Sequence, residues 1–376
     1  MALYNHNLDD YGWWEVGNRI HYNKVQAIFD HEASKLPIRW NYNDADYDQH
    51  QWNVEPAQTL KELYAQRAWQ LRSQYDYLVL HFSGGSDSGN VLETFINNGI
   101  HIDELLIRGS YSQTSGKTGR VSAADNYAEC LTQALPLAQW AKDHHYPHLK
   151  ITVVDTTELI NNYFATTPNW IENNVSGLSP GFFVKHDLDE ISPHYKVLAD
   201  QGKRVAHILG AEKPSIYRQK DTFYTSWTDT HLTTFIITRG TKSQYPQFTE
   251  CFYWGHNAVT MQIKQLHVLK NYIKANNIPD SMFDSKNGRA TERFIASVIY
   301  DRKLPLISEH EKEIGDSILA HRDAWFAKDP HSVAYQNWHK GVGYLETVLP
   351  ERWHDNKGFW TKGIKGIRSK PRYLGT

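Results

Sequence analysis

The segment Ser83–Ser88, with the sequence SGGSDS, combines residue types that bind phosphate groups. Its two adjacent glycines allow a tight turn and a close approach of the backbone to an anion. Its serines supply hydroxyl donors, and any of them can also cap a following helix. Asp87 is the exception, because a carboxylate repels phosphate. We expect Asp87 either to hold a Mg²⁺ ion that bridges phosphates or to act as a favourable charge at a helix N-terminus.

The flanking residues predict that this segment lies between a strand and a helix. The apolar run 77–82 (YLVLHF) precedes it, and a helical pattern that ends near Gly99 follows it. A helix N-terminus carries unpaired N–H groups and a partial positive charge, so this arrangement predicts an anion site. The later segment 109–120 contains GKT but has Tyr111 where a Walker A loop needs its first glycine. We therefore interpret that segment as a polar loop.

Four apolar runs in the first two thirds of the chain predict strands, at residues 77–82, 102–109, 150–156 and 204–210. Helical patterns separate them, and one of these, over 123–144, contains Pro136 as a kink or break. Strands that alternate with helices are typical of an α/β fold with a parallel sheet covered on both faces.

In this context SGGSDS resembles the PP-loop, S-G-G-x-D-S, of the N-type ATP pyrophosphatases. This superfamily of adenine nucleotide alpha hydrolase-like proteins includes asparagine, GMP and NAD synthetases and the queuosine-pathway nitrile synthase. Later stretches also resemble uncharacterised bacteriophage-type members. The resemblance implies a HUP-type, Rossmann-like sheet and cleavage of ATP to AMP and pyrophosphate with Mg²⁺. An acceptor oxygen would attack the α-phosphorus, and ammonia or an amine would then displace AMP.

The resemblance also implies roles for individual residues. ATP would be bound by the loop and by neighbouring strand ends, at Phe82, Ser83, Gly84, Gly85, Ser86, Asp87, Ser88, Ile107, Arg108 and Gly210. The loop would cradle pyrophosphate, and Asp87 would lie near the Mg²⁺ ion. Main chain at Ile107 and Arg108 would meet the adenine, although a surface charge is an equal interpretation of the Arg108 side chain.

Two other strand ends are candidates, because ligands of open parallel sheets bind beyond the carboxyl ends of the strands. Lys213 follows Gly210 on a tight loop, and we predict that it acts with Asp87 as a catalytic residue that neutralises charge on the polyphosphate. In the same loop Glu212 is a weaker candidate for accepting a proton or ligating metal. Asp155, at the end of the third strand, binds ribose or metal, or instead caps the next helix.

The sequence predicts three regions. Residues 1–72 form an N-terminal cap segment, residues 73–215 the ATP pyrophosphatase domain, and residues 216–376 a mainly helical region that shapes the acceptor pocket. A helix is expected over 258–276, and its polar side chains either line the substrate cleft or face solvent. The tail 357–376 has six Lys and Arg and no acidic residue. It either closes over phosphates, contacts tRNA or DNA, or is a plain exposed tail.

Composition limits the function classes. With 40 Lys and Arg against 42 Asp and Glu, global charge indicates neither a membrane nor a nucleic-acid partner. We expect no membrane span and no secretion signal, because apolar runs are short and the N-terminus lacks an apolar h-region. Two distant cysteines favour a reducing cytoplasm and exclude a metal site built from cysteines of this chain. Aromatic residues make up 13%, which favours a well-filled core over stacking surfaces.

Three functions remain open. The first is an adenylating ligase or amidotransferase that acts on a small molecule or a nucleobase. This chain lacks an N-terminal-cysteine glutaminase, so nitrogen would come from free ammonia, an amine substrate or a separate ammonia-supplying subunit. The second is a tRNA or DNA base-modifying enzyme of the same superfamily, and the third is a non-catalytic ATP-binding sensor. Since relatives are often dimers, the resemblance also suggests a homodimer.

Overall fold

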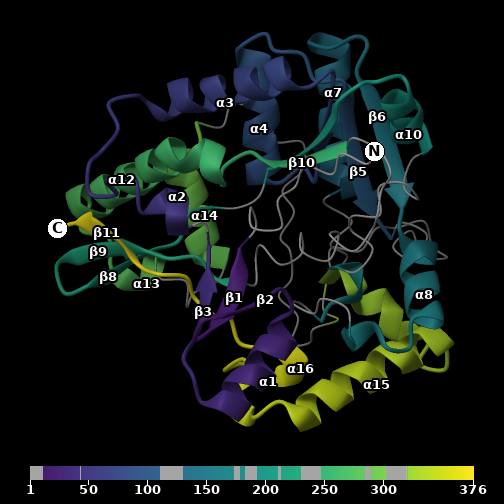
Figure 1. The fold of residues 1–376 in the computed structure, drawn as a ribbon. Helices are drawn as coiled ribbons and strands as arrows, with labels where there is room; N and C mark the ends of the chain where they lie inside the picture. The colour runs from purple at the N-terminus through teal and green to yellow at the C-terminus, as the bar shows by residue number, and fades with distance from the viewer. Residues whose placement is uncertain are drawn as a thin grey trace.

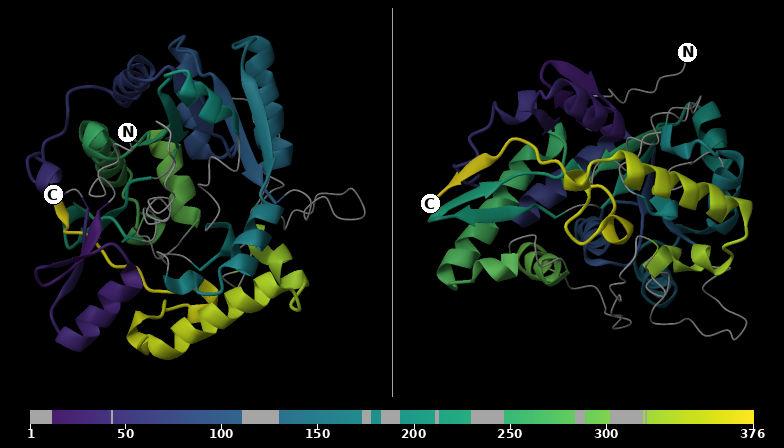
Figure 2. Two further views of the ribbon diagram at one scale, coloured as in Figure 1. Left: turned by 45° about the vertical axis from the view of Figure 1, so that its right-hand side comes forward. Right: turned by 90° about the horizontal axis from the view of Figure 1, so that it is seen from below.

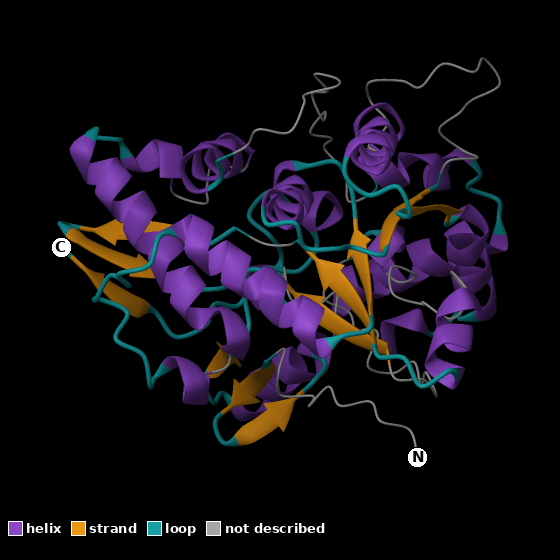
Figure 3. Ribbon diagram, turned by 90° about the horizontal axis from the view of Figure 1, so that it is seen from above, coloured by secondary structure: helices purple, strands orange, loops and turns teal. Residues whose placement is uncertain are grey.

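The structure, a computed structural model, describes residues 12–42, 44–110, 130–172, 178–182, 193–210, 213–229, 247–283, 289–301, 319 and 321–376. The described strands form three sheets, with helices packed around them (Figure 1). Seen from above, the three groups of strands lie apart from one another (Figure 3). The predicted α/β class is confirmed.

The central sheet has five parallel strands in the order β10-β7-β4-β5-β6. They are β4 (Tyr77–His81), β5 (Glu104–Gly109), β6 (Lys150–Asp155), β7 (Val205–Leu209) and β10 (Gln247–Cys251). Leu80 of β4 pairs with Leu105 of β5 on one side and Ile208 of β7 on the other. The first four strands coincide with the apolar runs that predict them. The fifth comes from the region beyond residue 215, which therefore also contributes to the sheet.

Helices pack against both faces of the central sheet. They are α3 (Leu60–Gln74), α4 (Ser86–Asn97), α7 (Leu135–His144) and α10 (Pro193–Asp200). A further helix, α8 (Thr157–Thr166), follows β6 and packs mainly against α15 (Val333–Val348). On one face Leu80 belongs to the same buried cluster as Leu92 of α4, and on the other Val79 packs with Tyr195 of α10. The helix expected over 123–144 is described from Cys130 onward. A π-helical turn, Cys130–Ala134, leads into α7, and Pro136 lies in the first turn of α7.

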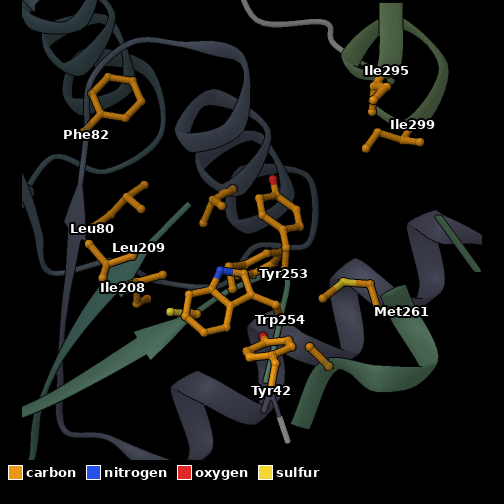
Figure 4. Close-up of a cluster of buried hydrophobic side chains, with 14 of the residues drawn as sticks. Tyr42, Leu80, Phe82, Ile208, Leu209, Tyr253, Trp254, Met261, Ile295 and Ile299 are labelled. Carbon is orange, nitrogen blue, oxygen red and sulfur yellow. The ribbon is translucent and has the colours of Figure 1, made fainter. Parts of the chain in front are cut away.

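The C-terminal region adds further helices. They are α12 (Val259–Ala275), α13 (Asp280–Phe283), α14 (Arg289–Ile299), α15 (Val333–Val348) and α16 (Phe359–Lys362), with 3-10 turns at His256–Ala258, His321–Lys328 and Glu351–Trp353. Two other 3-10 turns, at Trp170–Glu172 and Pro180–Phe182, lie between α8 and α10. In Figure 4, Leu80 and Ile208 of the sheet and Met261 of α12 lie around Tyr253 and Trp254. One continuous apolar core thus joins the central sheet to the C-terminal helices.

The N-terminal segment forms a small antiparallel sheet with two helices, and its buried residues belong to the main core. Its antiparallel sheet has the order β2-β1-β3, and its elements are β1 (Trp13–Val16), β2 (Arg19–His21), α1 (Lys24–Ser34), β3 (Ile38–Asn41) and α2 (Asp44–Tyr47). The Asn23 side chain caps α1 by accepting the backbone N–H groups of Val25 and Gln26. Figure 2 shows α1 beside the C-terminal helices, where Trp353 donates to Glu32 at 2.6 Å.

The third sheet incorporates the basic tail. It has the order β11-β9-β8, formed by β8 (Ile216–Gln219), β9 (Thr222–Thr225) and β11 (Arg372–Gly375). Arg372 is buried and donates to Asp44 at 2.6 Å, and Ile367 and Leu374 belong to the core. The tail is therefore a packed part of the fold, and the interpretation as a plain exposed tail is wrong.

A buried carboxylate joins the two ends of the chain. Asp229 accepts the indole N–H of Trp14 at 2.7 Å and the backbone N–H of Ile367 at 3.0 Å. Lys24 lies 2.9 Å from the same carboxylate, and both side chains of this ion pair are fully buried. A buried charge is tolerated when it is paired and hydrogen-bonded, and Asp229 meets both conditions.

Within the described ranges, no helix has the length and apolarity required to cross a membrane.

Asp229→Asn should destabilise the fold strongly, because it removes the charge that compensates the buried Lys24. Breaking a buried pair in this way costs about 3–5 kcal/mol of unfolding free energy. Asp280→Asn is the control, since its carboxylate pairs with Arg218 while 52% exposed and should cost less than about 1 kcal/mol. Urea titration of both variants measures the difference. Equal losses would contradict a special role for the buried carboxylate.

Candidate functional site

The loop between β4 and α4 has the backbone of an anion site. Gly85 is the N-cap of α4 and forms no side-chain capping hydrogen bond, so the first turn stays open to a ligand. The first intrahelical bond runs from the Gly89 N–H to the Gly85 carbonyl at 2.9 Å. Gly84 has a φ of +76°, and a Cβ there would lie 2.8 Å from the backbone nitrogen of Ala134. Only glycine fits that position.

The loop serines have two different environments. Ser88 is buried, and its hydroxyl accepts the backbone N–H of Ser83 at 3.3 Å and lies 3.3 Å from the Ser83 hydroxyl. These two serines therefore hold the loop closed. Ser86 is half-buried, and none of the described residues bonds its hydroxyl. Its hydroxyl thus remains able to donate to a ligand at the helix N-terminus.

Asp87 is held by two side chains from distant parts of the sequence. The Lys213 ammonium donates to one carboxylate oxygen at 2.6 Å, and the Tyr300 hydroxyl donates to the other at 2.7 Å. Asp87 is 26% exposed and Lys213 is 12% exposed, so the ion pair is only partly solvated. The structure therefore brings together the two residues that the sequence predicts as catalytic. It also adds a tyrosine to them.

Lys213 reaches Asp87 because the end of β7 lies directly against the start of α4. A Cβ on Gly210 would lie 2.8 Å from the Cα of Ser88 and 3.0 Å from its backbone nitrogen. The absence of a side chain at Gly210 permits this approach. Gly210 thus contributes to the site by letting the two backbone segments pack together. The resemblance to PP-loop proteins implies ATP binding at this position.

Two tyrosines lie beside Asp87 that the sequence does not identify as site residues. Tyr253 donates to the Asp87 carbonyl at 3.0 Å and accepts from Asn90 at 2.8 Å. Burial, with a further contribution from Tyr253 and Asp87, raises the pKa of Tyr300 well above its ordinary value. Tyr300 therefore remains a neutral hydroxyl donor over the physiological pH range. Because a tyrosine 213 residues away in the sequence carries no local signal, only the tertiary structure identifies it.

The residues assigned to adenine lie on opposite faces of β5. The Ile107 side chain is fully buried in the main core, and Phe82 is also a core residue at 2% exposure. Arg108 donates to Nδ1 of His81 at 2.8 Å, and Nε2 of His81 lies 3.0 Å from Nδ1 of His207. Since arginine can only donate, Nδ1 of His81 is the acceptor. The Arg108 side chain is thus anchored across the sheet, and a plain surface charge is the wrong interpretation of it.

Of the two other acidic candidates, Asp155 and Glu212, the structure describes only Asp155. Asp155 accepts the backbone N–H of Thr157 at 2.9 Å, at the start of α8, as the capping alternative predicts. Glu212 lies outside the described residues, as does most of the polar loop 109–120.

The polar side chains of α12 fit neither of the two interpretations. Gln265 is fully buried and donates to the Tyr64 hydroxyl at 3.0 Å. His267 lies 2.9 Å from the Trp52 carbonyl, and Lys270 donates to the Leu374 carbonyl at 2.7 Å. They tie α12 to the N-terminal segment and to the end of the chain instead of lining a cleft or facing solvent.

The described residues contain no group of three or more His, Cys, Asp or Glu side chains arranged to hold a metal ion. Asp87 alone could still hold a Mg²⁺ ion if a bound nucleotide and water supplied the other ligands. Magnesium usually binds one or two carboxylates together with substrate phosphates and water. Such an ion would replace Lys213 or Tyr300 on the carboxylate.

A scan against models of known protein families finds no match to this chain, and a search of curated proteins finds none either.

Gly210→Ala should displace the start of α4, because the new Cβ would overlap the backbone of Ser88. Overpacking of this kind costs about 1–3 kcal/mol. Gly343→Ala in α15 is the matched control, since a Cβ there meets nothing within 4 Å, and it should stabilise the protein by about 0.4–1 kcal/mol. Thermal unfolding of the two variants measures whether each substitution lowers or raises the unfolding temperature. A stable Gly210→Ala protein would contradict the close backbone approach.

Proposed function

We propose that this protein is an ATP pyrophosphatase-type adenylating enzyme, ligase- or amidotransferase-like, with a HUP-type fold. It converts ATP to AMP and pyrophosphate and activates an acceptor oxygen of a small molecule or nucleobase for attack by ammonia or an amine. The observation that supports this most directly is the contact between Lys213 and Asp87. It joins the SGGSDS turn to the end of the neighbouring strand at the carboxyl edge of the sheet.

The loop supplies donors for a leaving pyrophosphate. The open first turn of α4 presents backbone N–H groups and the positive end of the helix dipole. Ser86 adds a hydroxyl, and Lys213 adds a cation that is already within reach of the loop. Such donors, fixed before the reaction, stabilise charge that develops on the leaving group.

Asp87 would hold Mg²⁺ when nucleotide is bound, and Lys213 would then interact with the polyphosphate. A bound Mg²⁺ ion supplies charge neutralisation on phosphate oxygens. Tyr300 would continue to orient the carboxylate, because its hydroxyl stays protonated. The main task of this chain is therefore to position the reacting groups.

The reaction balances without an oxidant or reductant. The acceptor oxygen forms a bond to the α-phosphorus, and the bond from that phosphorus to the bridging oxygen breaks and releases pyrophosphate. The amine then attacks the activated carbon, and AMP leaves with the acceptor oxygen. Free ammonia, an amine substrate or a separate subunit would supply the nitrogen. A tRNA or DNA base as acceptor requires the same chemistry.

Asp87→Asn and Lys213→Met should each lower AMP formation by about 100-fold or more, as is typical when a charge-stabilising group is removed. The measurement uses ATP labelled on its α-phosphate, Mg²⁺ and either metabolite or tRNA fractions as acceptors. Lys203→Met is the control, because this exposed lysine follows α10 away from the loop. ADP and phosphate as products would contradict the proposal. Tight ATP binding without AMP from any fraction would favour the ATP-binding sensor.

Tyr300→Phe should lower kcat/KM by roughly 10- to 100-fold, since hydrogen bonds to charged groups contribute about 1.5–3 kcal/mol. The ring and its packing stay, so the loss should arise from a misoriented Asp87. Tyr64→Phe is the matched control, because Tyr64 is buried in the same aromatic cluster but donates to the Ile299 carbonyl. An equal loss of activity in both variants would show that packing, and not the contact with Asp87, is responsible.

A further inference from the structure

The third sheet carries a row of tyrosines on one face. Tyr224 of the middle strand β9 is paired in register with Tyr217 of β8 and with Tyr373 of β11. The ring centroids of Tyr217 and Tyr224 are 5.8 Å apart and nearly parallel at 21°. Those of Tyr224 and Tyr373 are 5.9 Å apart, and these two ring planes are tilted by 55°. We call Tyr217, Tyr224 and Tyr373 the tyrosine row.

The two faces of this sheet differ in burial. Ile216, Phe223 and Leu374 alternate with the tyrosine row and are buried, so the opposite face belongs to the core. Tyr373 is 48% exposed, and Tyr217 and Tyr224 are partly exposed. In Figure 1 the three strands lie at the edge of the molecule, next to α12 and α13. The tyrosine row therefore faces outward.

Cationic side chains lie on either side of the row. The Arg368 guanidinium lies over the Tyr217 ring, 5.7 Å from its centroid, and donates to Ser226 at 3.0 Å. Lys220 lies in the turn that joins β8 to β9, next to Asp221. Lys370 is also exposed, but it pairs with Asp48 at 3.0 Å. The surface is thus mildly basic, with Arg368 as the cation in direct contact with the row.

We infer that the tyrosine row with Arg368 binds single-stranded RNA. Aromatic side chains in a row provide stacking positions for successive bases, and arginine adds contacts to phosphate. The ring spacings of 5.8 and 5.9 Å exceed the rise of about 3.4 Å between stacked bases. Because Tyr217 stacks on Tyr224 and lies under Arg368, bases would stack on Tyr224 and Tyr373, whose ring planes are tilted by 55°. Bases held at such an angle are splayed apart, which only a single strand allows.

Other partners fit this face less well. A duplex is held chiefly by many phosphate contacts, whereas two of the nearby lysines have acidic neighbours. A protein partner would favour apolar neighbours, but the row is flanked on its own face by Gln219 and Thr222. RNA is favoured over DNA because the hydroxyls of Tyr224 and Tyr373, which bond no described side chain or backbone group, can bond a 2′-hydroxyl.

This binding surface is independent of the ATP chemistry proposed above. If both are correct, the acceptor is carried by RNA. If the adenylation proposal fails, RNA binding can still be measured without ATP, so the two results are distinguishable.

The test measures fluorescence anisotropy of a labelled oligouridylate of about twelve nucleotides, with an oligodeoxyuridylate and an RNA duplex of similar length as further arms. Tyr224→Thr and Tyr373→Thr remove the ring and introduce a β-branched residue that also favours strands, and each should weaken binding at least about fivefold. Tyr224→Phe and Tyr373→Phe keep the rings, so they should retain stacking and lose the preference for RNA over DNA. Arg368→Gln should remove about one phosphate contact. The slope of log K against log salt concentration should then become shallower by about 0.7.

Tyr344→Gln is the matched control, because Tyr344 is 52% exposed on α15 and outside the row; it should bind like the wild type. Unfolding temperatures of all variants verify that the sheet is intact. Absence of oligouridylate binding at about 50 mM salt, or equal binding by the threonine variants, would overturn the inference. The row would then be a cross-strand ladder that only stabilises the sheet. Equal or tighter binding to the oligodeoxyuridylate or to the duplex would overturn the assignment to single-stranded RNA.

Discussion

The arrangement of the candidate site depends on the contact between the end of β7 and the start of α4. Gly210 lies so close to Ser88 that its backbone leaves no room for a side chain. This contact places the residue three positions later, Lys213, within 2.6 Å of Asp87. A larger separation would leave Lys213 in solvent and Asp87 at an open helix N-terminus. Backbone packing at one glycine therefore determines the electrostatics of the loop.

A second constraint holds the rest of the chain around this site. Asp229 connects the N-terminal strand, the first helix and the C-terminal tail through Trp14, Lys24 and Ile367. Burying this carboxylate costs free energy unless all its partners are present, so the fold forms the three connections together. The tail is consequently held in place. Arg372 is used inside the fold, whereas Arg368 lies at the surface beside Tyr217.

The sequence predicted what depends on local patterns. The four apolar runs and the SGGSDS turn are short and contiguous, so periodicity and glycine content identify them. Lys213 is identified in the same way, because it lies in the loop that follows β7. Tyr300, the place of β10 beside β7 and the buried role of Arg372 could not be found this way, since each depends on a partner far away in the sequence. Arg108 shows the same limit, because its contact with His81 crosses between two strands.

The abundance of aromatic residues has two structural causes. Many of those that the structure describes are core residues, such as Tyr253, whose burial raises its pKa well above the ordinary value and keeps it a neutral donor beside Asp87. The tyrosine row differs, because its rings line one outward face in register instead of filling the interior. Cross-strand packing alone would be satisfied by any pair of large side chains. Two nearly parallel rings, a third ring tilted by 55° and a guanidinium over Tyr217 form the surface for which we infer binding of single-stranded RNA.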